Sequence, residues 1–475
     1  MSPSPAEVFA QLGRTDVPAR PTRLLDTAVV LGGSVAGLLA ARVLADYAGT
    51  VLIVERDELG GADRRGVPHG QQGHALLPGG RRQIERWFPG YTERAVALGA
   101  EVASGGELGG YVDGVRTVGT RETVLLSVSR PFLEAQIRER VLALPNVRVL
   151  TGRASGLEFG SGAVTGVHYL AGDSEVCVPA GLVVDAMGRA SKVGDWLSEQ
   201  GWARPPLRRV VTNINYATGY FARVPGTGTV KAGIVRNSPG YRATNIAVAA
   251  INAVEDNRWM ILLAGYGVDR PGRDGADFVA RCRTELPAVF GAAVAGEQLG
   301  EIRTYHQADS RRRDFDRIRL PAGLVAVGDA VASFNPAYGQ GLSSAALHAS
   351  CLAAYLETRP ALGEPAAMFF DLQRVVVDAA WEISTAGDAA RLPQVGRPPL
   401  GERVRGWLGS QVMAATVTDQ VIAERFDKVG TMLAHPSTLA DPRLALRAVV
   451  VNRLARRRRH TADPVPADVA ANPVG

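Results

Sequence analysis

The segment that most constrains the fold is residues 27–44, TAVVLGGSVAGLLAARVL. Residues 27–33 are apolar and β-branched and predict a short buried strand, while residues 36–47 are rich in Ala and Leu and predict a helix. Residues 50–56, TVLIVER, predict a second buried strand. Together they form a βαβ unit of about 30 residues, the setting in which a Gly-rich turn can bind a dinucleotide.

The turn inside this unit has Gly32, Ser34 and Gly37 at the three positions where the dinucleotide fingerprint has glycine. Gly32 suits the tight turn, and Gly37 suits close packing of helix on strand. Ser34, next to Gly33, adds a small side chain whose hydroxyl could donate to a phosphate oxygen. We expect these four residues to hold a dinucleotide pyrophosphate against the helix N-terminus. A plain Gly-rich turn is the structural alternative.

Glu55 ends the second predicted strand, 18 residues after Gly37. A carboxylate there can accept hydrogen bonds from the ribose hydroxyls of adenosine, whereas it would repel a 2′-phosphate. NADPH is therefore a poor occupant of this site. Glu55 and the adjoining Arg56 are assigned to the cofactor site.

A second constellation is GDAVASFNPAYGQGLSSAALHA, residues 328–349. A buried strand ends at Gly328-Asp329, and a loop then leads into a helix. Asp329 is placed to accept from the ribitol hydroxyls of a flavin, and the helix N-terminus can face the flavin N1/C2=O edge. The alternative is an ordinary helix cap after a turn. The residues assigned to the cofactor here are Asp329, Pro336, Gly339, Gln340 and Gly341.

Two further segments give weaker signals. In DAMGRAS, residues 185–191, Asp185, Gly188 and Arg189 could position the cofactor diphosphate or lie on a route for nicotinamide. Arg130 opens a predicted helix over residues 130–144 and can make a charge-assisted contact with a pyrophosphate or ribose. An ordinary turn and a surface arginine are the alternatives.

The segment RRGVPHGQQGHALLPGG, residues 64–80, contains His69 and His74, which could contact flavin, NADPH or substrate. A structural, hydrogen-bonded role is the alternative for His74. No carboxylate or cysteine cluster accompanies these histidines, and the three cysteines of the chain show no CxxC spacing. We therefore expect neither a metal site nor a disulfide framework.

Composition excludes several classes of protein. The 475 residues are 46% hydrophobic and 21% charged, and no apolar run reaches membrane-spanning length. The N-terminal residues show no secretory h-region, so we expect a cytoplasmic protein without stable membrane insertion. Of the net charge of +6, five arginines near the C-terminus contribute most, and they suit a solvated helix end. No nucleic-acid partner is expected.

The order of predicted elements indicates an α/β fold. We expect a Rossmann-like FAD-binding domain, an inserted, mostly antiparallel β-sheet substrate domain and a helical C-terminal region. The predicted boundaries are a flexible arm at 1–24, a discontinuous FAD-binding domain at 25–75, 105–200 and 300–355, a substrate domain at 76–104 and 201–299, a helical region at 356–460 and a disordered tail at 461–475.

Taken together, GGSVAG…VER, DAMGRAS and GDAVASFNPAYGQG resemble the group A flavoprotein monooxygenases, which are built like p-hydroxybenzoate hydroxylase, over about residues 25–440. The resemblance implies tight, non-covalent FAD, with Asp329 at the ribitol. SRPFLEAQIRERV is similar to the family helix whose leading arginine, here Arg130, contacts FAD. O2 is the implied co-substrate. NAD(P)H or a separate flavin reductase is the implied electron donor.

Within that class, RRGVPHGQQGHALL and FNPAYGQGLSSAALHA are most similar to bacterial flavin epoxidases of polyether antibiotic biosynthesis. This implies transfer of oxygen from a flavin C4a-hydroperoxide to alkenes of a large apolar polyketide, a lipophilic polyene. The sequence departs from its relatives at Ser34, at Gln72 and at Ala186-Met187. The tryptophan-halogenase signature WxWxIP is absent, which argues against chlorination.

Two other activities remain open: FAD-dependent aromatic hydroxylation, and reduction of isoprenoid double bonds by an enzyme resembling geranylgeranyl reductases. A second Gly-rich turn is absent, so NADPH has no domain of its own. No catalytic side chain is nominated, because the cofactor carries this chemistry. We expect the substrate to bind between the flavin edge and the sheet of residues 206–270.

Overall fold

The computed structural model describes residues 3–17, 21–58, 70, 72–226, 228–267, 270–306, 309–391 and 399–461, the last six of these in backbone only. His69 and nearly all of the predicted tail at 461–475 lie outside the described residues.

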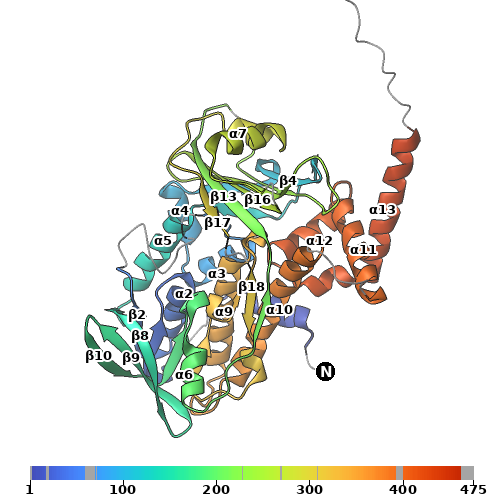
Figure 1. Ribbon diagram of the computed structural model, residues 1–475. Coiled ribbons are helices and arrows are strands. Elements are labelled where there is room, and N and C mark those ends of the chain that lie inside the picture. Colours follow the sequence, from blue (N-terminus) through green and yellow to red (C-terminus); the bar gives the residue numbers. More distant parts are fainter. Residues whose placement is uncertain are drawn as a thin grey trace, which may run out of the picture.

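A five-stranded parallel sheet carries the predicted βαβ unit (Figure 1). Its residues 28–31 are fully buried, as expected for a sheet with both faces covered. The helix of the unit is α2 (Val35–Leu44). The strands, in spatial order, are β19 (Leu324–Ala326), β11 (Leu182–Asp185), β1 (Leu25–Leu31), β2 (Ala48–Glu55) and β7 (Val147–Thr151).

Helix α9 (Gly341–Glu357) lies at the centre of this part of the molecule (Figure 1). Its residues 342–353 are all buried, because other helices pack around it. A helix that is buried all round needs small and apolar side chains on every face, and GLSSAALHASCLAAYLE provides them. The helices packed on it include α2, α3 (Pro78–Trp87) and α10 (Ala367–Ala389).

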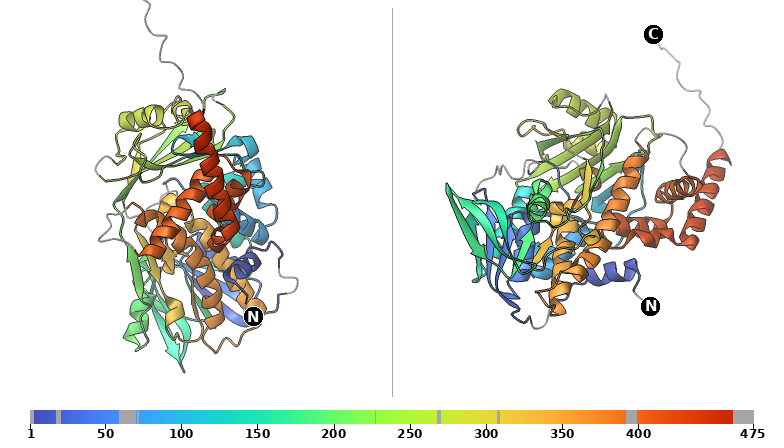
Figure 2. Two further views of the ribbon diagram at one scale, coloured as in Figure 1. Left: turned by 90° about the vertical axis from the view of Figure 1, so that its right-hand side faces the viewer. Right: turned by 60° about the horizontal axis from the view of Figure 1, so that its bottom comes forward.

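An antiparallel three-stranded sheet lies at the outer edge (Figure 2). Its first two strands are joined by a tight turn in which Ser161 and Gly162 both have positive φ. Its strands are β8 (Arg153–Gly160), β9 (Ala163–Ala171) and β10 (Ser174–Pro179). Helix α6 (Val193–Glu199) contacts β8, while α5 (Arg130–Leu142) packs on α2 and α4 (Tyr91–Ala97) on α3.

A seven-stranded sheet forms the upper part of Figure 1. Helices α7 (Gly275–Thr284) and α8 (Ala288–Ala293) cover one face, where Phe278 and Phe290 pack on buried strand residues such as Val235 and Ala249. The order is β17 (Arg303–Tyr305), β13 (Ile214–Ala222), β16 (Arg258–Tyr266), β15 (Ile246–Val254), β14 (Ala232–Arg236), β4 (Leu108–Val112) and β5 (Val115–Arg116).

Two small sheets complete the strands. One pairs β3 (Glu101–Ser104) with β6 (Val124–Ser127), and the other joins β12 (Leu207–Val210), β18 (Ser310–Arg313) and β20 (Ala332–Ser333).

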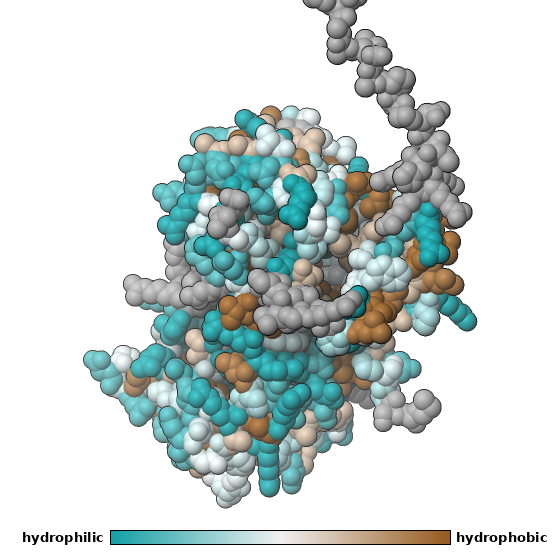
Figure 3. All heavy atoms as spheres, turned by 45° about the vertical axis from the view of Figure 1, so that its right-hand side comes forward, coloured by the Kyte–Doolittle hydropathy of each residue, from teal (hydrophilic) through white to brown (hydrophobic). Residues whose placement is uncertain are grey.

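The predicted helical C-terminal region is confirmed (Figure 2). After α10 come α11 (Leu400–Ala415), α12 (Gln420–Gly430) and α13 (Pro442–Thr461), which share a small core of their own. Apolar side chains are exposed on α11 and α13, among them Leu400, Trp407 and Leu446 (Figure 3). Within the described residues, none of the helices is both long enough and apolar enough to cross a membrane.

The fold class agrees with the prediction, but several segments lie outside their predicted domains. Strand β17, predicted in the FAD-binding domain, belongs to the seven-stranded sheet. Residues 5–12 of the predicted arm form helix α1 (Pro5–Leu12), which buries Phe9 and Leu12. Strands β4 and β5, predicted in the FAD-binding domain, extend the seven-stranded sheet, because β4 pairs in parallel with β14. Helix α3, predicted in the substrate domain, packs on α9 within the core that surrounds the parallel sheet.

Candidate functional site

The turn between β1 and α2 needs glycine at two of its positions. Gly32 has φ of +106°, and a Cβ there would lie 2.6 Å from the Ala186 carbonyl oxygen. A Cβ on Gly37 would lie 1.8 Å from the Gly32 carbonyl oxygen. The helix therefore starts in direct backbone contact with the turn, which is the geometry that a bound pyrophosphate requires.

Ser34 occupies the N-cap position of α2, but its side chain caps no backbone amide. The hydroxyl donates instead to Glu134 Oε2 on α5, at 2.9 Å. Its hydrogen is therefore engaged by a protein carboxylate, and the phosphate contact expected for it stays a prediction.

Glu55 lies at the end of β2, next to this turn. Its Oε2 accepts from the Gly33 N–H at 2.7 Å and its Oε1 from the Asp57 N–H at 2.9 Å. The carboxylate is buried and fastens the turn to the strand, in addition to any contact with a ribose. The Arg56 side chain is half-exposed beside Asp57, and its cofactor contact stays a prediction.

Arg130, His74 and Ser34 come from distant segments and meet at the start of α5. Arg130 Nη1 lies 3.0 Å from His74 Nε2, and Arg130 Nη2 donates to Ser34 Oγ at 3.4 Å. His74 Nδ1 lies 2.7 Å from the Gln72 carbonyl oxygen. Since a carbonyl only accepts, Nδ1 carries the proton and Nε2 accepts from Arg130. Sequence analysis missed Glu134, although it lies one helical turn after Arg130.

The loop that carries His74 is anchored on the large sheet. The Gly73 N–H donates to Thr218 Oγ1 of β13 at 3.0 Å, and Thr218 Oγ1 donates to Gln72 Oε1 at 2.9 Å. Thr218 was not predicted as a site residue, because no local pattern links positions 146 residues apart. Through this contact the loop joins the part built on the parallel sheet to the seven-stranded sheet.

Asp329 follows β19, in the short helical turn Gly328–Ala330. Gly328 has φ of +60° and donates its N–H to His348 Nδ1 of α9 at 2.9 Å. No described residue donates a hydrogen bond to the Asp329 carboxylate. Burial raises the pKa of Asp329, while the nearby guanidinium of Arg130 opposes that rise. The half-buried carboxylate therefore has free acceptor positions.

The predicted loop before α9 is a short helical turn, Pro336–Tyr338, followed by Gly339 with φ of +67°. Both polar atoms of the Gln340 side chain are buried and make no hydrogen bond. Gly341 is exposed, and a Cβ there would meet no atom within 4 Å. The first residue of an otherwise buried helix thus faces open space close to Asp329 in the fold.

A polar network fixes this loop. Asp388 Oδ1 of α10 accepts from Asn335 Nδ2 at 2.7 Å, from Tyr266 Oη at 3.0 Å and from Tyr338 Oη at 3.2 Å. Tyr216 donates to Asn335 Oδ1 and accepts from the Ala337 N–H at 2.9 Å. Burial raises the pKa of Asp388. Sequence analysis missed this network, whose members come from four separate elements.

Asp185 is fully buried, and its oxygens accept from Ser191 Oγ and from the Met187 N–H. These contacts hold its own turn, and the expected contact with flavin or NADPH stays a prediction. Gly188 has φ of +69° in that turn.

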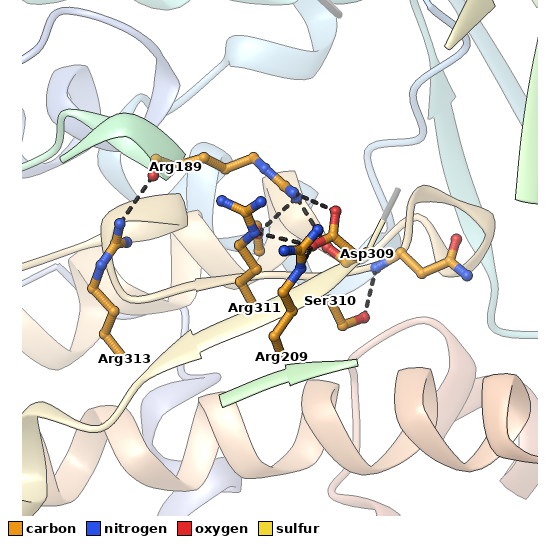
Figure 4. A network of polar contacts seen from close by, with 8 residues as sticks. Arg189, Arg209, Asp309, Ser310, Arg311 and Arg313 are labelled. Carbon is orange, nitrogen blue, oxygen red and sulfur yellow. Dashed lines mark hydrogen bonds and ion pairs between the residues drawn. The ribbon is translucent and has the colours of Figure 1, made fainter. Parts of the chain in front are cut away.

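Arg189 belongs to a cluster of guanidinium groups around Asp309 (Figure 4). Arg189 donates to the Asp309 carboxylate at 2.9 Å and to Ser333 Oγ at 2.9 Å. Arg209 and Arg311 pair with the same carboxylate, whose pKa they hold below its usual range against the effect of burial. Arg189 is thus committed to protein groups, and its predicted contact with a diphosphate stays a prediction.

The inner face of the large sheet, opposite α7 and α8, is partly open. Along β14 and β15, buried residues alternate with half-exposed ones, and the half-exposed side chains point away from α7 and α8. Ile234, Arg236, Val248 and Ala250 form this open strip. Val248 and Ala250 of this strip pack against the apolar cluster that also contacts Ala337 of the loop before α9.

The described residues include one group of side chains that could bind a metal ion. Glu158, His168 and Cys177 have ligand atoms within 4.8 Å of one another. They lie on the outer three-stranded sheet, and none of them belongs to the residues described above. The expectation that the site itself needs no metal stays a prediction.

Comparison with known proteins supports this architecture. No protein-family model matches the chain. The fold is similar to the flavin-dependent brominase Bmp2, with a TM-score of 0.63 at 16% identity, over 91% of this chain and all of the other. It is also similar to p-nitrophenol 4-monooxygenase PnpA from Pseudomonas putida (0.61, 17%, over 87% and 99%). PqsL from Pseudomonas aeruginosa, a probable FAD-dependent monooxygenase, scores 0.58 at 18% identity, over 77% and 98%.

The chain therefore has the fold of flavin-dependent monooxygenases and halogenases. A sequence relative is Protein Rv3254 of Mycobacterium tuberculosis, which is 33% identical over 437 residues, 87% of this chain and 91% of the relative. This degree of identity over most of both chains places them in one family. The chain belongs to the family of Protein Rv3254.

Proposed function

We propose that this protein is an FAD-dependent monooxygenase. The observation that carries the proposal is the half-buried Asp329 carboxylate, which has no hydrogen-bond donor among the described residues and lies near the exposed N-terminus of buried helix α9. A buried carboxylate without donors is costly. The hydroxyls of a ribitol chain would supply the missing donors.

The residues present fit FAD. The turn at Gly32 and Gly37, with the first amides of α2, would hold the pyrophosphate. Glu55 would accept from the adenosine ribose. The N-terminus of α9, beginning at the exposed Gly341, would face the flavin edge that becomes negative on reduction.

FAD, when bound, supplies the activation of O2. The protein would bind an alkene on the open, apolar strip of the sheet, orient it toward the loop before α9 and keep water away. We infer epoxidation: alkene, O2, NAD(P)H and a proton yield epoxide, water and NAD(P)⁺. NAD(P)H could reduce the flavin directly or through a separate reductase.

More specifically, we propose that the substrate is a large apolar polyketide and that its alkenes are epoxidised. Its support is the three half-exposed apolar residues of the strip, Ile234, Val248 and Ala250, with the motif resemblance to polyether epoxidases. Epoxidation also agrees with the site because no acid–base pair is needed. The monooxygenases and halogenases among the structural neighbours agree with oxygen chemistry in general.

The test is an assay of purified protein with its flavin identified by absorbance and chromatography. With NADPH or chemically reduced flavin, ¹⁸O2 and a panel of polyenes, we expect one labelled oxygen in an epoxide. Formation of hydroxylated arenes from a panel of aromatic compounds would indicate an aromatic hydroxylase and not an epoxidase. Formation of a saturated product under anaerobic conditions would indicate a reductase of double bonds and not an epoxidase. Protein that binds no flavin would overturn the proposal entirely.

A further inference from the structure

Arg236 is the one charged side chain in the open strip of residues 234, 236, 248 and 250. It ends β14 and pairs across the sheet with Val248 of β15. Val248 packs with the apolar cluster that contacts Ala337 of the loop before α9, whereas the neighbouring Val235 packs beneath α7 and α8. Because side chains alternate along a strand, Arg236 faces the same side as Val248.

The Arg236 guanidinium has no partner in the described protein. It is half-buried, forms no hydrogen bond or ion pair, and burial lowers its pKa. The carboxylate of Asp427 on α12 acts to raise the pKa of Arg236. Asp427 forms no ion pair with Arg236, and it accepts a hydrogen bond from Thr123 Oγ1 instead. Partly buried charges are normally paired. The partner that is missing here is an anion.

The distance from Arg236 to the loop before α9 restricts the ligand. One row of cross-strand partners runs from Tyr216 through Ala264 and Val248 to Arg236. Tyr216 accepts a hydrogen bond from Ala337, so this end of the row touches the loop. Three strand spacings separate Tyr216 from Arg236, which is about 14 Å. Between these two ends lie Ala264, which is fully buried, and Val248, which is half-buried, so a ligand would contact this row at Val248.

We propose that Arg236 binds the carboxylate of an elongated, otherwise apolar substrate, whose far end reaches the loop before α9. The inference rests on the proposed function for the position of the flavin at that loop. A guanidinium can hold a carboxylate through two parallel hydrogen bonds, which fixes both position and direction. A small aromatic acid cannot span the row, so an extended monocarboxylate is the class that fits.

The test compares the C18 acid α-linolenate with its methyl ester, which keeps the chain and removes the charge. Binding to the holoprotein is measured by calorimetry without reductant. We expect Arg236→Gln to weaken binding of the acid about 30-fold, since charge-assisted hydrogen bonds are lost, and to leave the ester unchanged. Arg236→Lys should recover part of the affinity. Arg242→Gln, an exposed arginine after the same strand, is the matched control.

Equal affinity of the wild-type protein for acid and ester would overturn the proposal, and this comparison needs no variant to fold. Equal binding of the N-acetylcysteamine thioester would do the same, because it would indicate a carrier-bound substrate. Arg236-dependent binding of the acid with no oxygenated product would contradict the proposed function and leave the carboxylate site standing. Oxygenation of acid and ester at equal KM would contradict only the carboxylate site.

Discussion

At the scale of single residues, substitution of Asp329 should weaken ligand binding without lowering stability. Its carboxylate makes no hydrogen bond to a described residue, so Asp329→Ala should leave the free energy of unfolding of the flavin-free protein unchanged or higher. The dissociation constant for FAD should rise about 10- to 100-fold, since hydrogen bonds to a charged group are lost. Flavin titration and urea unfolding measure the two quantities.

The control for this change is Asp173→Ala, which removes an exposed carboxylate at the β9–β10 turn. Glu55→Ala should behave differently from Asp329→Ala, because Glu55 holds the amides of Gly33 and Asp57 and its loss should also lower stability. Unchanged FAD affinity in Asp329→Ala would contradict the assignment of the ribitol to this carboxylate.

His348 gives a pH dependence with a definite sign. Its ring is fully buried and accepts from the Gly328 N–H, and burial lowers its pKa from 6.5 to about 3. Between these values the unfolded chain binds a proton that the folded protein does not, so stability is complete above pH 6.5 and is lost as the pH falls. From pH 6.5 to 5 we expect a loss of about 2 kcal/mol from this residue.

His348→Gln keeps an acceptor for Gly328 and a donor for Ser344 but does not titrate. Urea unfolding at pH 5 and pH 7 should therefore show a smaller pH difference in this variant than in the wild type. The half-exposed His168 supplies the control, as His168→Gln. An identical pH difference in wild type and His348→Gln would show that the ring is not buried in its neutral form.

Gly37 and Gly341 are expected to be needed for different reasons: Gly37 for the fold and Gly341 for ligand binding. Gly37→Ala would bring a Cβ to 1.8 Å from a backbone oxygen, so we expect a loss of about 3 kcal/mol or more in the free energy of unfolding. Gly341→Ala places its methyl group in open space and should leave stability nearly unchanged. Its FAD affinity should fall, because the methyl group would occupy space next to the flavin. Full FAD affinity in Gly341→Ala would exclude a flavin edge at this helix.

At the scale of elements, helix α1 shows what local sequence can and cannot predict. Ser4 and Glu7 form a capping box with Pro5 at the first helical position, a signal readable from the sequence. The packing partners of Phe9 cannot be predicted from the local sequence, because they lie in the C-terminal region, where Phe9 packs edge-on against His435. Phe9→Ala should therefore cost about 3 kcal/mol in urea unfolding, and Gln11→Ala, exposed on the same helix, almost nothing.

The βαβ unit was predictable because strand and helix periods are clear within 30 residues and the turn has its own chemistry. The place of β4 was not, because its partner β14 lies more than 100 residues later and two short strands carry no signal of the sheet they join. The residues of the candidate site likewise fall into a predictable and an unpredictable group. Gly32, Gly37 and Asp329 follow local motifs, whereas Thr218, Glu134 and Asp388 are defined only by tertiary contacts.

At the scale of the whole molecule, two large hydrophobic cores meet across a polar boundary. One core surrounds α9 and the parallel sheet, and the other lies between the seven-stranded sheet and α7 and α8. The network around Asp388 crosses the boundary, because it joins α10, the loop before α9 and strands β13 and β16. These hydrogen bonds therefore help to fix the loop before α9 relative to the strip of residues 234, 236, 248 and 250, together with the apolar cluster that contacts Ala337.

This dependence predicts coupling between Tyr266 and Tyr338, which donate to the same oxygen of Asp388. Tyr266→Phe and Tyr338→Phe should each cost about 1 kcal/mol, and the double variant should deviate from their sum by at least 0.5 kcal/mol, as is typical for residues that share a partner. FAD affinity should fall further in the double variant, because Asn335 is then the one described residue that still donates to Asp388 and holds the loop. Tyr241→Phe, a half-buried tyrosine beyond β14, is the control for loss of a hydroxyl. Additive stabilities with unchanged FAD affinity would mean that apolar packing holds the loop before α9 in place without the network around Asp388.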